Sequence, residues 1–279
     1  MISINGQIAD QLTVSDRAFQ YGDGCFTTMA YVNGQLSLWS QHLARLQADC
    51  QRLAIAFTQW TALEQALHTV LVQVTEANAV IKVVITRGQG GRGYSPLGVS
   101  APSFVISSHP FPSHYADWQQ LGINLAHCPL TLAKQPLLAG LKHLNRLEQV
   151  LIKQAMAVYD EEDALVCDTD GVIVESSAAN VFWLQDGQWY TPSLSDCGVA
   201  GVMRQQVIKL LASRHEQVLE VRQMLNASFN ADEMFICNAL MGVVPVRSLV
   251  SRQLAQHWQF DTAVTGQLQH DLTHYCAPL

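Results

Sequence analysis

The sequence has few charged residues and no cluster of basic ones. Only 14% of its 279 residues are charged, and the 16 lysines and arginines are scattered along a chain of net charge −7. Nucleic-acid-binding proteins and proteins attracted to anionic membranes need concentrated positive charge, so the sequence favours neither class. No apolar run approaches the ~18 residues that span a bilayer, and the first ten residues lack the basic and apolar regions of a signal peptide. These absences predict a cytoplasmic protein.

Paired cysteines and internal repeats are also missing. The chain has 7 cysteines, an odd number without a C-x-x-C pair, which argues against a disulfide framework or a zinc site. A hydrophobic fraction of 49% instead predicts a sizeable core, in one large or two small domains. The His-Pro-Phe-Pro-Ser-His stretch at 109–114 resembles a linker, so we expect a small N-terminal α/β domain over 1–112 and a larger domain over 113–279.

Alternating strand and helix signals fill the first half of the chain. A strand follows Gly24, with Thr27 and Thr28 near its start, and Asn33-Gly34 marks a hairpin. We expect a helix capped by Ser40 that runs to residue 53, and a second helix over 59–74. Four residues on the outer side of the first helix are most simply an ordinary solvated face: His42, Arg45, Asp49 and Arg52.

The second half predicts consecutive hairpins and therefore antiparallel β structure. Asp170-Gly171 and Asp186-Gly187 each separate two strand-like runs. A glycine-marked loop leads into a helix that begins near Gly201 and Val202, and its free N–H groups would suit a phosphate, although most helix starts bind only water. A strand, a bend at Asn238 and Ala239, and another strand follow.

Lys142 is the leading catalytic candidate. It lies among apolar residues of the stretch 136–151, where loss of solvent favours the neutral, nucleophilic amine that forms Schiff bases. Asn145 and Glu148 read as a capping box, so a helix of about four turns is expected to begin near Arg146. The ordinary alternative is a lysine whose stem covers the core and whose ammonium reaches water.

Glu175 is a second candidate, because it ends the apolar run 172–174. A carboxylate there is costly to bury unless a cation or strong donor meets it, and the alternative is a strand-end glutamate that faces water.

The glycine-rich loop over 88–98 carries a third candidate site. Its five glycines permit close backbone approaches, and Arg92 and Tyr94 are placed to contact an anionic ligand. The loop has neither the Walker-A pattern nor a clear G-x-G-x-x-G between a strand and a helix. A non-catalytic phosphate- or nucleotide-binding module and a mobile loop both stay open.

Several separated motifs together resemble one family. The segments SDRAFQYGDGCFTT, KVVITRGQGGRGYS, LAGLKHLNRLEQVLI, VESSAANVFW, GVMRQ and EMFICNALMGVVPV are similar, in this order, to the fold-type IV pyridoxal-phosphate enzymes, and most of all to the aminodeoxychorismate lyase family of folate synthesis. The resemblance implies an α/β (α+β) fold, with a small N-terminal α/β domain and a larger domain of antiparallel β pseudo-barrel and helices. It also implies pyridoxal 5'-phosphate as cofactor and a homodimer.

The same resemblance assigns roles to individual residues. Lys142 would form the Schiff base with the cofactor, Glu175 would pair with its pyridine nitrogen, and Arg45 would bind its phosphate. Backbone donors at Gly201, Val202, Asn238 and Ala239 would complete the phosphate site. Thr28 is a weaker catalytic candidate, and Arg92 and Tyr94 are assigned to substrate carboxylates. The implied reaction releases pyruvate and 4-aminobenzoate from 4-amino-4-deoxychorismate, and the alternative is a branched-chain or D-amino-acid aminotransferase.

Overall fold

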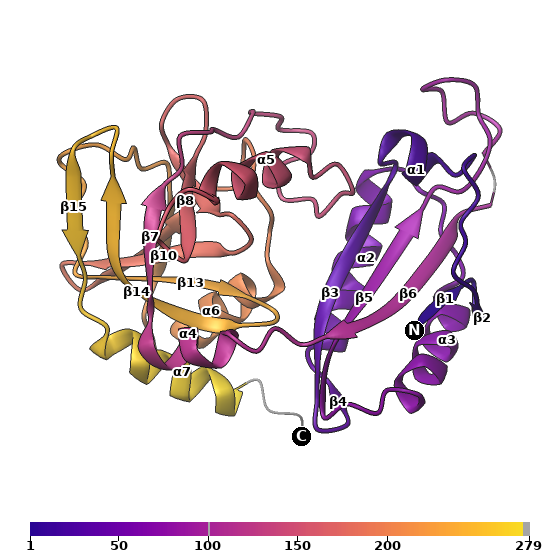
Figure 1. Ribbon diagram of the computed structural model, residues 1–279, viewed down its shortest axis with the longest axis horizontal. Helices are drawn as coiled ribbons and strands as arrows, with labels where there is room; N and C mark the ends of the chain where they lie inside the picture. Colours follow the sequence, from indigo (N-terminus) through magenta and orange to yellow (C-terminus); the bar gives the residue numbers. More distant parts are fainter. Residues whose placement is uncertain (100, 276–279) are drawn as a thin grey trace. The chain divides into compact units, whose positions relative to one another are not determined.

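The structure is a computed structural model that describes residues 1–99 and 101–275, without the side chains of 273–275. It divides into two compact units (Figure 1). Unit 1 comprises Met1–Phe111 together with Lys142–Asn145, and unit 2 comprises Pro112–Leu141 and the chain from Arg146 onward. No helix within the described ranges is long and apolar enough to cross a membrane.

Unit 1 is built on a six-stranded antiparallel sheet with the strand order β2-β1-β6-β5-β3-β4. The long central strands are rich in β-branched residues, which favour an extended backbone. Asn33 and Gly34 both adopt positive φ and make the predicted tight turn between β3 and β4. The strands are β1 (Ile2–Ile4), β2 (Gln7–Ile8), β3 (Gly24–Val32), β4 (Gln35–Leu36), β5 (Asn78–Thr86) and β6 (Ser103–Pro110).

Two helices, α2 (Trp39–Arg52) and α3 (Trp60–Val72), pack their apolar residues into one core with one face of this sheet (Figure 1). Leu46 and Cys50 of α2 meet Cys25 and Met29 of β3 there, all nearly or fully buried. A short helix, α1 (Arg17–Tyr21), begins where the Asp16 carboxylate accepts the N–H of Ala18. The prediction that Ser40 caps α2 is wrong, because the helix starts at Trp39 after Leu38 in the left-handed region.

The four residues Lys142–Asn145 extend unit 1 by pairing with the start of β3. The N–H of Phe26 donates to the carbonyl of Lys142, and the N–H of Leu144 donates to the carbonyl of Gly24, both at 3.0 Å. The Asn145 amide donates to the Gly22 carbonyl at 3.1 Å. These bonds hold Lys142 beside β3 within unit 1.

The predicted capping box is wrong, because Asn145 and Glu148 bond to residues that are distant in the sequence. Helix α5 (Leu147–Met156) has Arg146 at its N-cap position and no side-chain cap. Asn145 bonds instead to Gly22, and the Glu148 carboxylate accepts the N–H of Ala133 at 2.8 Å. Tertiary partners have replaced the local ones, and the helix has 10 residues rather than about four turns.

Unit 2 contains a nine-stranded mixed sheet with the strand order β12-β11-β10-β13-β14-β7-β8-β9, and β15 pairs with β14. The predicted hairpins are present, with Asp186 and Gly187 at positive φ between β10 and β11. Three neighbour pairs are nevertheless parallel: β7 with β8, β7 with β14, and β11 with β12. The strands are β7 (Ile123–His127), β8 (Asp163–Cys167), β9 (Ile173–Ser176), β10 (Asn180–Gln185), β11 (Gln188–Pro192), β12 (Val218–Val221), β13 (Glu233–Asn238), β14 (Gly242–Ser251) and β15 (Gln256–Gln259).

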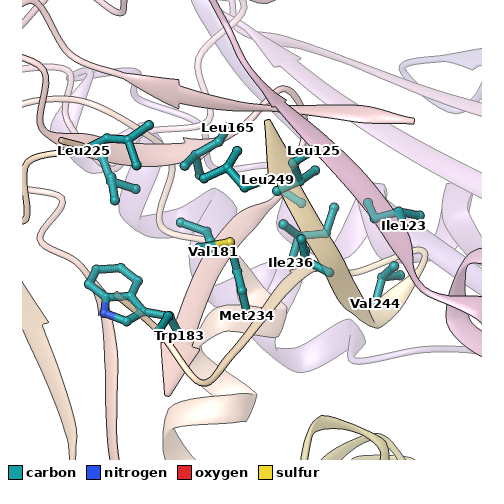
Figure 2. Close-up of a cluster of buried hydrophobic side chains, with 14 of the residues drawn as sticks. Ile123, Leu125, Leu165, Val181, Trp183, Leu225, Met234, Ile236, Val244 and Leu249 are labelled. Carbon is teal, nitrogen blue, oxygen red and sulfur yellow. The ribbon is translucent and has the colours of Figure 1, made fainter. Parts of the chain in front are cut away.

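The core of unit 2 is enclosed by this sheet. Figure 2 shows aliphatic side chains of β7, β13 and β14 gathered with Trp183 of β10. Burial of such side chains stabilises a fold by about 1.5–3 kcal/mol each, so this cluster supports the strands that carry the candidate residues. The helices of unit 2 besides α5 are α4 (Tyr115–Leu121), α6 (Val202–Ser213) and α7 (Ala263–Tyr275). β15 and α7 lie beyond Arg247, in the last part of the described chain.

Candidate active site

Arg45 lies in a polar cluster between α2 and β3 of unit 1. Its Nη2 donates to the hydroxyl of Thr27, and the same hydroxyl lies 2.6 Å from Nδ1 of His42. The Thr27 hydroxyl thus bridges the Arg45 guanidinium and the His42 imidazole. His42 and Thr27 are both 0% exposed, so this helix face is not the solvated surface expected from the sequence.

The charges of this cluster follow from its burial. Burial, with the nearby charges of Arg45 and Lys142, lowers the pKa of His42 to about 3, so the imidazole is neutral at physiological pH. Burial also lowers the pKa of Arg45 to about 10, although Asp49 acts in the opposite direction, and the guanidinium remains charged. Nε of Arg45 is buried and has no hydrogen-bond partner among the described residues. A buried cationic donor without an acceptor fits an anionic ligand.

Asp49 joins this cluster to Lys142. Its carboxylate accepts the backbone N–H of Lys142 at 3.3 Å and is 4% exposed. Burial raises the pKa of Asp49, and this effect is partly offset by the Lys142 hydrogen bond and the Arg45 charge. Asp49 thus fixes the main chain at Lys142.

The Lys142 ammonium faces an aromatic ring. Its Nζ lies 4.6 Å from the ring centroid of Phe26, and Nζ of Lys82 lies 5.0 Å from the same centroid. A cation over a ring face is stabilised electrostatically, by about 0.5–1 kcal/mol when exposed and more when desolvated. Lys142 itself is half-buried. The sequence placed it among apolar neighbours, but within unit 1 its surroundings also include Arg45, Asp49 and the second ammonium.

Glu175 of unit 2 is buried rather than facing water. It lies on β9 and is 5% exposed, and its Oε2 accepts the N–H of Val199 at 3.0 Å. The loop that provides this N–H is itself held by Gly140, which exchanges two backbone hydrogen bonds with Gly198 and Ala200 at 2.9 and 3.0 Å. A buried carboxylate of this kind can pair with a protonated ligand atom.

Gly201 and Val202 form the N-terminus of α6, where the helix has no side-chain cap. A Cβ on Gly201 would lie 2.1 Å from Oδ1 of Asn180, so only glycine fits. Asn180 is held by its amide, which donates to the Val199 carbonyl at 2.8 Å. The α6 N-terminus therefore presents backbone donors and the positive end of the helix dipole.

The bend at Asn238 and Ala239 follows β13, as predicted. The Asn238 side-chain oxygen accepts the N–H groups of Leu240 and Met241, both at 2.9 Å, and its amide donates to the Ala178 carbonyl at 3.2 Å. One short segment, 175–180, therefore connects Glu175, the start of α6 and this bend within unit 2.

The three remaining candidates lie elsewhere in unit 1. Thr28 is half-buried and adjacent to Thr27 on β3, so its side chain lies on the opposite face of the strand, paired in register with Lys82. Arg92 is exposed on the 88–98 loop, and Tyr94 is 88% exposed with its ring 5.4 Å from that of Tyr21. These two lie on a surface loop and outside the Arg45 cluster.

The two units together contain the functional groups that pyridoxal 5'-phosphate requires. Unit 1 has a lysine amine and an arginine with a buried, unpartnered Nε, and unit 2 has a buried carboxylate and an uncapped helix N-terminus. These observations fit an aldehyde, a phosphate and a ring nitrogen that is to remain protonated. The cofactor predicted from the sequence is therefore compatible with the residues present.

Sequence reasoning missed the supporting residues Thr27, His42 and Asp49. A signal existed for two of them: His42 and Asp49 lie three before and four after Arg45, on one helix face. That spacing also describes a solvated face. Only the β3 and Lys142–Asn145 segments, which cover this face, distinguish the two interpretations.

The family model described as "Amino-transferase class IV" matches residues 24–249. An aminodeoxychorismate lyase from Vibrio harveyi is 42% identical over 250 residues, which cover 89% of this chain and 91% of that protein. A putative branched-chain-amino-acid aminotransferase from Methanocaldococcus jannaschii is 27% identical over 90% of this chain and 88% of its own length. The crystal structure of 4-amino-4-deoxychorismate lyase from Pseudomonas aeruginosa superposes with a TM-score of 0.90 at 36% identity, covering 98% of each chain.

Proposed function

Because the chain belongs to the class IV aminotransferase family, we propose that it is a pyridoxal-phosphate-dependent lyase. It converts 4-amino-4-deoxychorismate to 4-aminobenzoate and pyruvate, a step of folate synthesis. The observation that carries this choice of reaction is the 42% identity to a lyase along most of the chain, well above the identity to the aminotransferase. Branched-chain or D-amino-acid transamination is the alternative on the same fold.

Pyridoxal 5'-phosphate is the cofactor. Lys142 holds it covalently, Arg45 binds its phosphate, and Glu175 keeps its ring nitrogen protonated. Backbone donors complete the phosphate site at Gly201, Val202, Asn238 and Ala239. When bound, the cofactor supplies an electron sink for the electrons of a broken C–H bond. What supports these roles is the chemistry of each group: a buried unpartnered guanidinium Nε, an uncapped helix start and a buried carboxylate.

Lys142 also acts as the base. With the cofactor and substrate bound, the Lys142 amine would remove the proton from the substrate carbon that bears nitrogen. The Asp49 carboxylate keeps the Lys142 main chain in place, since it accepts its N–H at 3.3 Å. After the proton is lost, the ring C–O bond to the neighbouring enolpyruvyl group breaks and the ring becomes aromatic. The released enolpyruvate takes up a proton at its methylene carbon and becomes pyruvate. We assign Thr28 a supporting role in proton transfer.

The substrate carries two carboxylates, and we propose that Arg92 and Tyr94 contact them. Arg92 offers a planar fork that matches a carboxylate, and Tyr94 offers a hydroxyl donor. Both are exposed on the 88–98 loop, where an incoming anion can reach them.

We further propose a homodimer. Helix α5 exposes an apolar stripe with helical spacing, in which Leu147, Val150 and Leu151 are 76%, 59% and 53% exposed. Such a stripe is costly to leave in water, and a second copy of the chain would bury it. Sedimentation velocity at micromolar concentration measures this state. The proposal also places the enzyme in the cytoplasm, where the Cys25 and Cys50 thiols, hydrogen-bonded at 3.8 Å without a disulfide, suit a reducing compartment.

The deciding experiment compares two reactions in the same preparation. Purified enzyme is given aminodeoxychorismate and, separately, branched-chain or D-amino acids with 2-oxoglutarate, while 4-aminobenzoate, pyruvate and glutamate are followed. We expect 4-aminobenzoate and pyruvate in equal amounts and little glutamate. The Lys142→Ala variant should lose turnover almost completely, and borohydride should no longer fix the cofactor to the protein.

The possible outcomes distinguish the candidate functions. Glutamate formed at comparable efficiency would favour the aminotransferase alternative. A colourless protein that retains a nucleotide would favour the binding module on the 88–98 loop. Near-normal turnover by Lys142→Ala would remove the assigned role of that residue while leaving the family membership intact.

A further inference from the structure

Arg17 lies buried beneath the 88–98 loop, with its side chain 4% exposed. Its guanidinium Nη atoms donate to four main-chain carbonyls of the loop, those of Gly90, Gly93, Tyr94 and Ser95, at 3.4, 3.1, 3.1 and 3.3 Å. Its Nε donates to Asp23 at 2.8 Å. The buried Arg17 guanidinium thus holds together the turn of the loop that bears Arg92 and Tyr94.

Asp23 fixes Arg17 in turn. The Oδ2 atom of Asp23 accepts from Nε of Arg17 and from Nε of Arg87, both at 2.8 Å. Burial would raise the pKa of Asp23, but the hydrogen bonds from Arg87 and Arg17 hold it below its usual value, so the carboxylate is ionised. Arg87 directs its other donors away from the loop tip, to the carbonyls of Leu53 and Ala54, both at 2.7 Å.

The other hydrogen bonds of the loop lie mostly at its start, where the Arg17 N–H donates to the Gly88 carbonyl at 2.9 Å and the Ser15 hydroxyl donates to the Gln89 side chain at 2.9 Å. Within the turn that Arg17 contacts, the Ser95 N–H donates to the Arg92 carbonyl at 3.2 Å. The ring of Tyr94 contacts that of Tyr21, which also lies 4.9 Å from the Arg17 guanidinium. Charge-assisted hydrogen bonds from a buried arginine are stronger than these contacts, so Arg17 dominates the order of the loop.

The sequence of the loop fits the arginine. Gly91 has φ +77°, and a Cβ there would lie 2.3 Å from the Ser95 carbonyl oxygen and 2.9 Å from Arg17 Nη1. Gly93 also has a positive φ, of +57°, but a Cβ there would meet nothing within 4 Å. The glycine at 91 is thus required mainly by the close approach of the Ser95 carbonyl, which itself accepts from Arg17, whereas the glycine at 93 is required only by its own backbone conformation.

We propose that Arg17 is a positioning residue that holds the 88–98 loop in the conformation that receives the substrate carboxylates. Arg17 contacts the loop only through main-chain carbonyls, so it sets where Arg92 and Tyr94 stand without binding substrate itself. Preorganising a binding loop removes the entropy cost of ordering it when substrate arrives. The substrate part of this inference rests on the proposed lyase function, whereas the ordering of the loop by Arg17 does not.

Loop order is tested with trypsin on the cofactor-loaded enzyme. Arg92–Gly93 is a cleavage site inside the loop, and fragments 1–92 and 93–279 report its opening. We expect Arg17→Gln to be cut there about tenfold faster than the parent, the factor that corresponds to lost charge-assisted hydrogen bonds. Arg87→Gln is the matched control, because it breaks an equal contact with Asp23 without touching the loop tip, and its cleavage rate should stay near that of the parent.

A pair of glycine substitutions tests the packing of the same turn, because a Cβ at Gly91 would displace the Ser95 carbonyl that accepts from Arg17. Gly91→Ala should open the loop as Arg17→Gln does, whereas Gly93→Ala carries only the strain of a left-handed alanine and should be cut much more slowly. This pair also serves if Arg17→Gln does not fold. Parent-like cleavage of both Arg17→Gln and Gly91→Ala would overturn the proposal.

Steady-state kinetics separate loop order from the reaction. For Arg17→Gln we expect KM for aminodeoxychorismate to rise about tenfold, with kcat and the affinity for pyridoxal phosphate near those of the parent. An opened loop with an unchanged KM in an active enzyme would overturn the substrate part. If the parent itself does not turn over aminodeoxychorismate, the lyase assignment fails, and the cleavage rates still decide whether Arg17 orders the loop.

Discussion

The candidate residues of the two units are held by different means. In unit 1, Arg45 is surrounded by side chains: the Thr27 hydroxyl, the His42 imidazole and the Asp49 carboxylate. In unit 2, Glu175 meets a main-chain N–H, that of Val199, and the α6 N-terminus is shaped by the absence of a side chain at Gly201. Unit 1 therefore relies on the identity of its side chains and unit 2 on the course of its backbone.

Substitutions in the two units should therefore have different effects. Changing a side chain of the Arg45 cluster alters charge and hydrogen bonding but leaves the backbone of α2 intact. Changing the shape of the backbone loop in unit 2 displaces several donors together. An isosteric substitution at Glu175 is the informative exception, since it removes the charge while its amide oxygen can still accept the Val199 N–H.

We expect Glu175→Gln to have the largest effect among these variants. The amide oxygen can still accept from Val199, so the loop and the bound cofactor should be retained. The negative charge that keeps the ring nitrogen protonated is lost, and the rate should fall by about two orders of magnitude or more. Absorbance of the bound cofactor and single-turnover rates measure the two effects. An unchanged rate would show that a main-chain environment alone suffices at this position.

Arg45→Gln should weaken cofactor binding by roughly 10- to 100-fold, the cost of losing hydrogen bonds from a charged donor. Arg52→Gln is the matched control, because it removes an arginine from the same helix on the other side of Asp49. Titration of apoenzyme with pyridoxal phosphate measures both dissociation constants. Equal effects of the two substitutions would mean that the overall charge of α2, and not the Arg45 cluster, binds the phosphate.

Gly201→Ala should have a smaller effect, and the affected quantity is the stability of the protein. Its Cβ would lie 2.1 Å from the Asn180 oxygen, so the loop must shift, at a cost of about 1–3 kcal/mol of stability. Gly266→Ala on α7 meets nothing within 4 Å and should stabilise the helix by up to about 1 kcal/mol. Urea denaturation of the two variants provides the comparison. If Gly201→Ala were as stable as the parent, the argument from backbone shape would not hold for α6.

Much of the fold could be predicted from the sequence. The strands and hairpins of both units follow from local patterns such as Asn33-Gly34 and Asp186-Gly187, whose turn geometry requires positive φ. The expected fold-type IV architecture is confirmed by the family match and by the similarity to a solved lyase along nearly the whole chain. The three parallel strand pairs were not foreseen, because hairpin signals report only strands adjacent in sequence.

The candidate site was less predictable because it depends on distant partners. Asn145 and Glu148 have the spacing of a local cap but bond to Gly22 and Ala133. The burial of Asp49 depends on Lys142, which is 93 residues away in the chain. Arg17 gave no signal at all, since its acceptors are main-chain carbonyls that any residue provides. Local spacing cannot indicate which of several faces a remote segment will cover.

The pairing of Lys142–Asn145 with β3 also determines when the N-terminal half of the chain can finish folding. Gly24 and Phe26 find their backbone partners in Leu144 and Lys142, which are synthesised after the whole of Met1–Phe111. A nascent chain that ends at Phe111 would leave this end of β3 exposed to solvent and to other strand edges. The lysine proposed for catalysis is therefore also among the last residues to complete the sheet, so its segment links the maturation of the first unit to translation of the second.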